Sequence, residues 1–468
     1  MIDTFSIRCS ILRLAFSGKL SEQRVAEGTA KELLLRISPK KNIEKTENTP
    51  YEIPDSWVWV RIADLYKINP KVEASGTIKA AFIPMERISA GFARSFSYET
   101  QNWEQASKNH TRFADGDVAF AKISPCFENR KSFIAQGLPN GIGGGTTELI
   151  ILRQEEMLPE YTYYLLLDQR FINTGKASYK GTVGQQRVQS DVVKNYLVPV
   201  PPYAEQQRII ERIERAFSVL DTIDALQVQY ADNFTVLKSK LIDAAIQGKL
   251  TEQLPEDGTA EQLYQLIKED KQKRIAAGII KKEKPVIEVD NGPHAIPYSW
   301  KWVRLGNIAT ILGGKRIPAG RSLTTEDTGH TYIRVSEMKN RTVITDGLLF
   351  VPDDIYPSIS QYIIKKEDIY ITVAGTIGRV GKIPPEIDGA NLTENADRIV
   401  FTNLDQDWLI LCLSSSEVQK QIELLTTQVA QPKLAIKRIQ EFLIPLPPFA
   451  EQKRIVQKLD EVLKMVES

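Results

Sequence analysis

Cysteine, histidine and net charge are all scarce in this chain, and each scarcity excludes a class of protein. The 468 residues include three cysteines and three histidines, and Lys plus Arg exceed Asp plus Glu by one. Three scattered cysteines cannot form a disulfide framework, and the histidines lack the spacing of metal ligands. They are Cys9, Cys126, Cys412, His110, His294 and His330. We therefore expect a reducing compartment and no structural metal.

Long apolar segments are also missing. No run of 18 apolar residues occurs, and the first 20 residues lack a basic segment followed by a continuous apolar block. We therefore expect a cytoplasmic protein without membrane contact.

A net charge of +1 provides no overall attraction for nucleic acid, so any anion-binding surface must be local. The length predicts more than one domain.

Enzyme motifs are equally hard to find. There is no G-x-x-x-x-G-K-[S/T] phosphate loop, and the cluster GIGGGT at 141–146 does not follow a strand-to-helix fingerprint. VPPY at 200–203 and LPPF at 446–449 superficially resemble the [N/D]-P-P-[Y/F] motif of DNA amino-methyltransferases. Val200 and Leu446 cannot accept a hydrogen bond from an amine, however. We expect no catalytic residues, no cofactor site and no metal site in this chain.

The segment 199–250 predicts one very long helix. It contains no Pro or Gly between Tyr203 and Gln247, and it would extend about 65 Å. Residues at alternating steps of four and three form a heptad seam, which predicts a long partner helix. The seam comprises Ile209, Ile213, Ala216, Leu220, Ile223, Gln227, Tyr230, Phe234, Leu237, Leu241 and Ala244. The polar Gln227 near its centre is typical of a residue that sets register.

The chain contains an internal repeat carried by three segments in the same order. PVPPYAEQQRI from Pro199 recurs as PLPPFAEQKRI from Pro445, with eight of eleven positions identical. GKLSEQRVAEGTA from Gly18 recurs from Gly248 with eight of thirteen identical, and IPDSWVWVRI from Ile53 recurs from Ile296 with seven of ten identical. The protein is therefore built twice.

The repeats are circularly cut. Residues 1–20 correspond to 231–250, and residues 449–468 correspond to 203–222. The second copy of the long helix is thus divided between the two ends of the chain. We predict that both ends pack antiparallel to the central helix, with Met1 and Ser468 separated by about eight helical residues, or about 12 Å.

Between the repeated segments, two regions of mixed α/β character share edges and little of their interiors. Strands are expected at 117–123, 148–152, 368–373 and 398–401, and helices at 159–171 and 408–425. The predicted fold is a pseudo-two-fold repeat of two globular α/β domains joined by a long antiparallel coiled coil. Its parts are an N-terminal helix at 1–20, a connecting segment at 21–50, domain 1 at 51–198, the central helix at 199–250, a connecting helix and linker at 251–295, domain 2 at 296–444 and a C-terminal helix at 445–468.

Polar, basic loops in both domains are candidates for DNA contact. Arg, Lys, Asn and Gln can bond base edges or phosphates, and Gly lets a backbone N–H approach a phosphate. Any one such loop could equally be an ordinary solvated loop. The predicted DNA-binding residues are Lys108, Arg112, Arg130, Lys131, Lys176, Tyr179, Lys180, Gln185, Gln186, Arg187, Lys315, Arg316, Arg321, Lys339, Arg341, Gln428, Gln431 and Lys433. Lys180, Arg187 and Lys433 are assigned to phosphates, and Gln185, Gln186 and Gln431 to bases.

The doubled P-[VL]-P-P-[YF]-A-E-Q-x-R-I segment, the GKL-[ST]-E-Q segment and the two unlike domains resemble the DNA-specificity subunit of type I restriction-modification systems over essentially the whole chain. The resemblance implies two target-recognition domains that each read one half of an asymmetric, bipartite DNA site, with the helices fixing the gap. It also implies a non-catalytic chain that assembles on double-stranded DNA with two methyltransferase subunits and two restriction/translocase subunits. S-adenosylmethionine, ATP and Mg would be bound by those partners. Family members often begin directly with the first recognition domain, whereas this chain begins inside a helix.

Two further hypotheses concern other roles of the chain. Helix positions Glu205, Gln206, Arg208, Glu451, Gln452 and Arg454 could serve partner subunits, or could fix the chain where it enters the helix from the prolines. The chain as a whole could instead be a two-domain protein-binding scaffold, or a fused restriction enzyme with its own methylase or nuclease site. The missing methylase and phosphate-loop motifs count against the fused enzyme.

Overall fold

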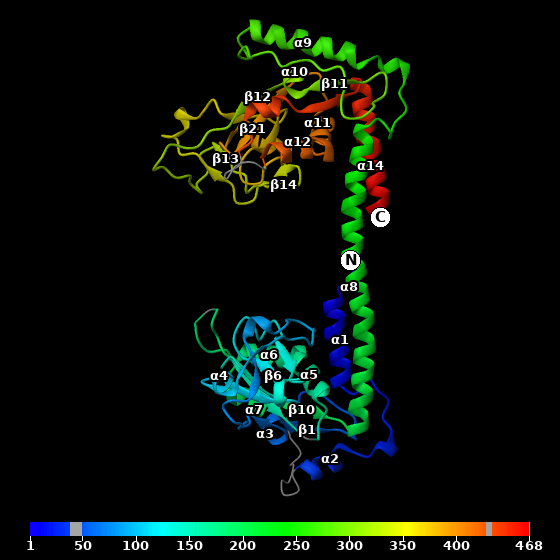
Figure 1. The fold of residues 1–468 in the computed structure, drawn as a ribbon, viewed down its shortest axis with the longest axis vertical. Helices are drawn as coiled ribbons and strands as arrows, with labels where there is room; N and C mark the ends of the chain where they lie inside the picture. The colour runs from blue at the N-terminus through cyan, green and yellow to red at the C-terminus, as the bar shows by residue number, and fades with distance from the viewer. Residues whose placement is uncertain (38–48, 155, 183, 427–432, 468) are drawn as a thin grey trace. The chain divides into compact units, whose positions relative to one another are not determined.

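The computed structural model describes residues 1–37, 49–154, 156–182, 184–426 and 433–467 (Figure 1). The chain divides into two compact units, Met1–Gln229 and Tyr230–Ser468. Each unit contains one mixed α/β domain and one part of the longest helix. The mixed α/β architecture with a long helix confirms the predicted fold class.

The longest helix, α8, spans Tyr203–Ile246 and contains 44 residues. It starts directly after Pro201 and Pro202, where the proline rings preset the backbone for a helix start. It ends before Gly248, whose φ of +71° suits glycine and lets the Lys249 amide bond the Ala244 carbonyl. The predicted long helix is therefore confirmed.

In the first unit, α8 packs against the N-terminal helix α1 (Thr4–Phe16). Gln227 exchanges two hydrogen bonds with the backbone of Ile2. Thr4 donates to Asp224, and Arg8 pairs with Asp221 at 2.6 Å and with Asp224 at 2.9 Å. The contacted residues of α8 decrease in number as those of α1 increase, so the two helices are antiparallel. Gln227 contacts the backbone just before α1 begins.

In the second unit, the C-terminal helix α14 (Phe449–Glu467) lies alongside the later part of α8 (Figure 1). The Tyr230 hydroxyl donates to the Val466 carbonyl at 3.0 Å, and Ile242 shares a core cluster with Ile455 and Leu459. This pair is also antiparallel. The predicted distance between Met1 and Ser468 involves a residue outside the described part of the chain.

The heptad seam of α8 is only partly covered. Ile209, Ile213 and Leu220 are buried in the first unit, whereas Tyr230 is 55% and Leu237 is 37% exposed in the second. The predicted seam is therefore packed at these positions of the first unit and partly exposed at Tyr230 and Leu237. At Tyr230, the hydroxyl group donates to the Val466 carbonyl near the end of α14, and the ring stacks with Phe234.

The domain of the first unit is built on two four-stranded sheets, with strand orders β2-β9-β6-β7 and β4-β3-β8-β5. All neighbouring pairs are antiparallel except β3 and β8, which are parallel. The strands are β2 Lys67–Ile68, β3 Lys79–Ile83, β4 Glu99–Asn102, β5 Thr111–Ala114, β6 Val118–Ala121, β7 Ser132–Ile134, β8 Ile142–Gly145 and β9 Leu149–Arg153. A further pair, β1 (Val58–Arg61) and β10 (Leu197–Val200), connects the domain to α8.

The second unit repeats this frame. Its sheets have the orders β12-β21-β18-β19 and β16-β13-β20-β17, again with one parallel pair, β13 and β20. The strands are β12 Ala309–Gly313, β13 Thr331–Ile333, β16 Leu349–Phe350, β17 Ile363–Ile364, β18 Ile369–Thr372, β19 Val380–Lys382, β20 Ala390–Leu392 and β21 Ala396–Phe401. The pair β11 (Lys301–Arg304) and β22 (Leu443–Leu446) matches β1 and β10, and a hairpin of β14 (Met338–Lys339) and β15 (Thr342–Val343) is additional. The two interiors thus share a topology that their sequences do not reveal.

Helices cover these sheets in both units. The expected helices at 159–171 and 408–425 are each two helices, which corrects the prediction. In the first unit, the break is at Asp168, whose extended backbone separates α5 from α6. The helices are α2 Ala30–Ile37, α3 Ile62–Leu65, α4 Trp103–Ser107, α5 Pro159–Leu167, α6 Gln169–Ala177, α7 Ser190–Asn195, α9 Ala260–Ala276, α10 Leu305–Ile308, α11 Gln406–Leu413, α12 Ser416–Thr426 and α13 Ile436–Gln440; short 3-10 turns are η1 Val25–Glu27, η2 Met85–Arg87, η3 Pro139–Gly141, η4 Pro255–Asp257, η5 Tyr356–Ser358 and η6 Pro385–Ile387.

Candidate nucleic-acid interface

The three repeated segments of the sequence meet at one buried carboxylate in each unit. In the first unit, Glu205 accepts hydrogen bonds from the Ser21 hydroxyl at 2.7 Å, the Gln23 amide at 2.8 Å and the Trp57 indole at 2.8 Å. In the second unit, Glu451 accepts from Thr251, Gln253 and Trp300. The repeat therefore preserves a structural joint between the helix, the GKL segment and the first strand of the domain.

The residues that follow each glutamate complete this joint. Gln206 accepts from the Leu158 amide at 3.1 Å, and its counterpart Gln452 accepts from the Asp405 amide at 2.9 Å. Arg454 forms a bidentate pair with Asp257, whereas Arg208 forms a single ion-pair contact with Glu27 and donates to the Glu22 carbonyl.

These glutamates and glutamines are buried, with Glu205 only 1% exposed. Their position supports the hypothesis that they fix the start of the helix. It argues against direct contact between their side chains and a partner subunit.

The loop predicted to contact DNA in the first unit is a hairpin. Lys180 and Arg187 exchange backbone hydrogen bonds at 3.2 and 2.9 Å, which closes the loop between them. Gly181 and Gly184 have φ values of +120° and +84°, which side chains disfavour. On either side of this loop, Lys180 and Gln185 are exposed.

The hairpin is anchored beside the end of β6. The Val188 amide donates to the Lys122 carbonyl, and the Lys122 amide donates to the Glu148 carbonyl. The second unit repeats this ladder, because the Leu434 amide donates to Val373 and the Val373 amide donates to Asn395. Val188 and Leu434, the residues that follow the two predicted reading loops, are therefore anchored at the same place on the frame.

The structure brings part of the first basic set together. Lys176 and Lys180 are exposed, and the Tyr179 ring packs at 6.2 Å from Phe127, next to the segment 128–133. The Gln186 carbonyl accepts from the Ser124 amide. Arg187 forms an ion pair with Glu148 at 2.8 Å, and hydrogen bonding to that carboxylate raises the pKa of Arg187.

Two members of the predicted set are used inside the protein. Arg130 is 6% exposed, donates to the Leu167 carbonyl and Gln169, and lies over the ring of Phe5. These internal contacts do not support its assignment as a DNA contact, because its donors are used within the fold. Lys131 is half-buried and donates to the Met85 carbonyl at 2.8 Å.

Lys108 and Arg112 are distant from the hairpin in the sequence, and they lie beside a different sheet. Lys108 is exposed after α4, and Arg112 projects from β5, where its guanidinium lies 5.9 Å from the ring of Trp103. Both belong to the sheet that contains β8 rather than to the sheet that contains β6. The structure therefore does not join them to Lys180 and Arg187.

In the second unit, three predicted cations gather around Glu394. Arg316 pairs with its carboxylate at 2.5 Å, Lys433 donates to its backbone carbonyl at 3.3 Å, and the Lys315 amide bonds the neighbouring Leu392 carbonyl. Lys315 and Arg316 are exposed. Gln428 and Gln431, which were predicted to lie in the same loop, fall outside the described residues.

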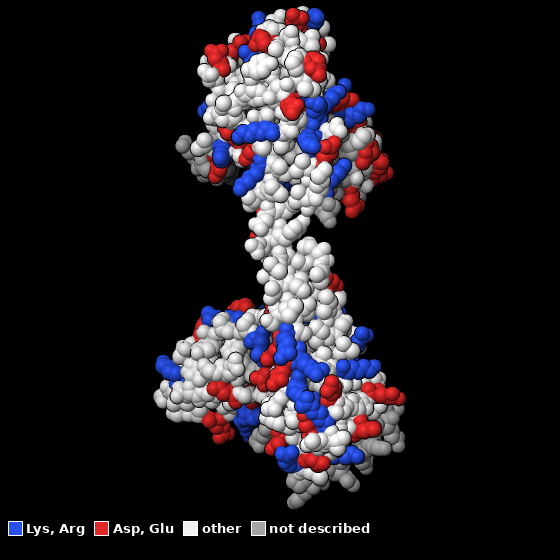
Figure 2. Space-filling model, turned by 90° about the vertical axis from the view of Figure 1, so that its right-hand side faces the viewer, with Lys and Arg blue, Asp and Glu red and all other residues white. Residues whose placement is uncertain are grey.

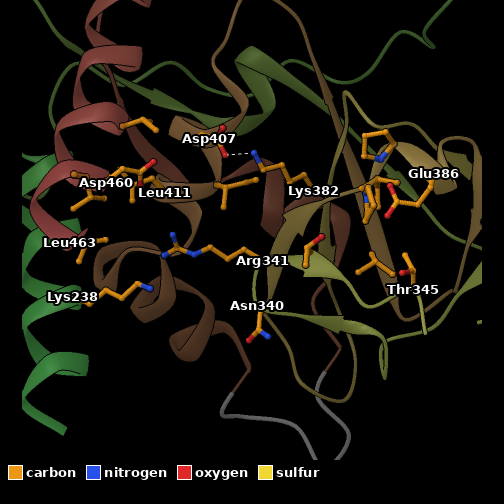
Figure 3. A pocket seen from close by; sticks show the side chains of 18 residues that line it. Lys238, Asn340, Arg341, Thr345, Lys382, Glu386, Asp407, Leu411, Asp460 and Leu463 are labelled. Atoms are coloured by element: carbon orange, nitrogen blue, oxygen red, sulfur yellow. Dashed lines mark ion pairs between the residues drawn. The ribbon is translucent and has the colours of Figure 1, made fainter. Parts of the chain in front are cut away.

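The remaining predicted residues of the second unit are separate from this group. Arg321 pairs with Asp354, and Lys339 is exposed on β14. Arg341 follows in the β14–β15 turn with a φ of +59° and lines a pocket of about 700 Å³. Figure 3 shows its side chain extending across the pocket towards Lys238 and Asp460. Burial lowers the pKa of Arg341.

The surface charge is local, as the near-zero net charge requires. Figure 2 shows Lys and Arg gathered on the displayed face of each unit, with Asp and Glu interspersed. Among the described residues, no group of His, Cys, Asp or Glu is arranged to hold a metal ion. None of the helices in the described part of the chain is long and apolar enough to cross a membrane.

Sequence reasoning missed the two acidic partners, Glu148 and Glu394. A signal for them was present, because Thr147-Glu148 and Thr393-Glu394 are identical dipeptides separated by 246 residues. The same separation relates Pro199 to Pro445 and Arg187 to Lys433. That offset points to both glutamates, although the strand registers match Glu148 with Asn395 and Glu394 with Thr147.

Comparison with known proteins places this architecture in a family. The chain is 31% identical to the "Type I restriction enzyme EcoAI specificity subunit" of Escherichia coli, over 99% of this chain and 90% of that protein. It is 29% identical to the EcoEI specificity subunit of Escherichia coli, with the same coverage.

Solved structures show the same fold. A chain from a structure of type I R-M system assembly and conformational transition gives a TM-score of 0.63 at 19% identity, covering 89% of this chain and 93% of that chain. The HsdS subunit from Thermoanaerobacter tengcongensis gives a TM-score of 0.54 at 19% identity, covering 90% and 93%. The family described as "Type I restriction modification DNA specificity domain" matches residues 54–228 and 297–468, and the chain belongs to this family.

Proposed function

We propose that this chain is the non-catalytic subunit that selects the DNA sequence for a type I restriction-modification complex. Each α/β domain reads one half of an asymmetric, bipartite site. The observation that carries this proposal is the repeated frame of two sheets, which anchors the residues after two differently composed basic loops, Val188 and Leu434, in the same way. Two domains with the same sheet topology but different loop sequences suit the reading of two different half-sites.

A selection from a random duplex library tests this function. The chain, assembled with its methyltransferase partner, should enrich two blocks of preferred bases separated by a spacer of constant length and variable sequence. Enrichment without sequence preference, or of a single block, would contradict the proposal. Because phosphate contacts weaken with salt, the selection should be repeated at more than one salt concentration.

The reading loops supply the contacts. Lys180, Arg187 and Lys433 bind phosphates, and Gln185 and Gln186 lie near base edges. Replacing Lys180 and Arg187 together with Gln should weaken binding and reduce the slope of log affinity against log salt by up to about two, because each phosphate contact contributes about 0.9. Unchanged affinity at several salt concentrations would remove this hairpin from the interface.

The helices set the gap and receive the partner subunits. Val219 and Leu226 of α8, and Ile7 and Leu14 of α1, stay exposed at seven-residue spacing, which suits a further helix. Inserting about two helical turns next to Gln227 should change the permitted gap without changing either half-site. A changed half-site with an unchanged gap would contradict the role of the helix as a spacer.

The complex works in the cytoplasm, with two methyltransferase and two restriction/translocase subunits. These partners supply the sites for S-adenosylmethionine, ATP and Mg, and this chain supplies recognition. Methylation by the isolated chain, measured with S-adenosylmethionine and target DNA, would contradict its non-catalytic role.

A further inference from the structure

Each unit places a glutamate against the cations of its predicted reading loop. In the first unit, both oxygens of Glu148 accept from Arg187 Nε at 3.1 and 3.0 Å, and one also accepts from Arg187 Nη2 at 2.8 Å. The same guanidinium donates to the Gln185 carbonyl at 3.0 Å. Most donors of Arg187 are therefore occupied within the protein.

This pair lies at the surface rather than in the core. The Arg187 side chain is 44% exposed and the Glu148 side chain 21%. A phosphate that approaches Arg187 therefore meets the carboxylate beside it. Hydrogen bonds from Arg187 lower the pKa of Glu148, which keeps that group ionised at neutral pH.

The second unit also places a glutamate against predicted loop cations, with different contacts. Glu394 lies 246 residues after Glu148, and its carboxylate pairs with Arg316 while its carbonyl accepts from Lys433. Lys433 is the counterpart of Arg187 at the same offset. The strand registers place Asn395 rather than Glu394 at the position of Glu148, so the two units carry their carboxylates at neighbouring positions of the shared frame.

Resting on the proposed function, we propose that Glu148 and Glu394 are specificity determinants that weaken binding to non-target DNA. Non-target DNA is bound almost entirely through its phosphates. Each carboxylate occupies a loop cation and repels the phosphate backbone, so phosphate contact alone binds weakly. Target DNA adds contacts to base edges, which compensate for the loss.

A merely structural role for the pair leads to a different expectation. If Glu148 only braced Arg187 for DNA contact, removing the carboxylate would weaken binding to target and non-target DNA alike. If it screens phosphates, its removal strengthens non-target binding. The two roles are therefore distinguished by whether the affinity for non-target DNA rises or falls when the carboxylate is removed.

The experiment compares Glu148→Gln and Glu394→Gln in the full chain with its methyltransferase partner. Fluorescence anisotropy measures binding to a duplex that carries the selected target and to a scrambled duplex, between about 50 and 200 mM salt. Each variant should bind the scrambled duplex several-fold more tightly at low salt, with a log–log salt slope steeper by about 0.9. Glu148→Asp, which keeps the charge, should stay close to the wild type.

Glu99→Gln is the matched control. Glu99 pairs with Arg87 at 2.8 Å on β4, at the sheet edge opposite β5, and its replacement makes the same change in net charge. Equal gains for Glu99→Gln and Glu148→Gln would overturn the proposal, as would unchanged or weaker binding of both variants to the scrambled duplex. The two variants lie in different units, so misfolding of one leaves the other as the test. Wild-type protein that binds both duplexes alike would instead overturn the proposed function.

Discussion

The buried joint at Glu205 provides a sharp test of what the repeated sequence motif does. We consider Glu205→Gln, which preserves size and removes one acceptor together with the charge. In the wild type, one carboxylate oxygen accepts from Ser21 and Gln23 and the other from the Trp57 indole. The amide of the variant places an NH2 group opposite at least one of these donors. A buried donor then loses its partner.

The expected cost follows from these contacts. A buried donor left without a partner costs about 1–3 kcal/mol, and hydrogen bonds to an ionised acceptor are stronger than neutral ones. Orphaning one or two donors should therefore destabilise the first unit by about 2–4 kcal/mol. Glu451→Gln should cause a comparable loss in the second unit, because Glu451 accepts from three equivalent donors.

Urea unfolding followed by tryptophan fluorescence measures this loss, since Trp57 belongs to the joint. Gln207→Ala, at an exposed neighbouring position of α8, is the control and should change stability by no more than about 0.5 kcal/mol. If Glu205→Gln is as stable as this control but fails to retain the methyltransferase in a pull-down, the motif serves a partner surface. The structural explanation would then be refuted.

Three further predictions address other parts of the chain. Arg8→Met should remove the ion pairs between α1 and two aspartates of α8. The amide hydrogen-exchange rate of α1 should rise about tenfold, which corresponds to a loss of about 1.4 kcal/mol in the free energy of opening. An unchanged rate would contradict a stabilising role of these ion pairs. Gly144→Ala should unfold the first domain, because its Cβ would lie 1.8 Å from the Ala106 carbonyl oxygen. Gly76→Ala, whose Cβ would have its nearest atom at 3.4 Å, should be tolerated. Circular dichroism measures both variants, and equal stability of the two would refute this argument. Burial raises the pKa of Asp397 from 3.8 to about 6, so its ionisation opposes folding and stability is lost as pH rises through that interval. Asp397→Asn should therefore add up to about 3 kcal/mol at pH above about 7 and progressively less towards about pH 4, and a pH-independent difference in thermal unfolding would count against it.

Much of the fold was predictable because it depends on local signals. The absence of Pro and Gly between Tyr203 and Gln247 predicted α8, and the circular repeat predicted its two antiparallel partners. The shared sheet topology was not predictable, because equivalent strands need only fit their own neighbours. Strand β8 requires glycine where the Ala106 carbonyl approaches, whereas Asn391 of β20 donates to the Ile359 carbonyl.

The candidate site was less predictable, because the type of a residue does not determine its exposure. Arg130 and Arg187 look alike in sequence, but Arg130 is buried against Phe5, which is far away in the chain. The partner of Arg187 lies 39 residues earlier, so only the 246-residue offset pointed to it.

The most direct test of the account is a genome-wide map of methylated adenines in cells with and without this gene. The account predicts that deletion removes methylation at one asymmetric sequence made of two half-sites with a constant gap. Replacing residues 51–198 with the corresponding domain of a relative should then change one half-site only. An unchanged methylation map after deletion would contradict the assignment of sequence selection to this chain.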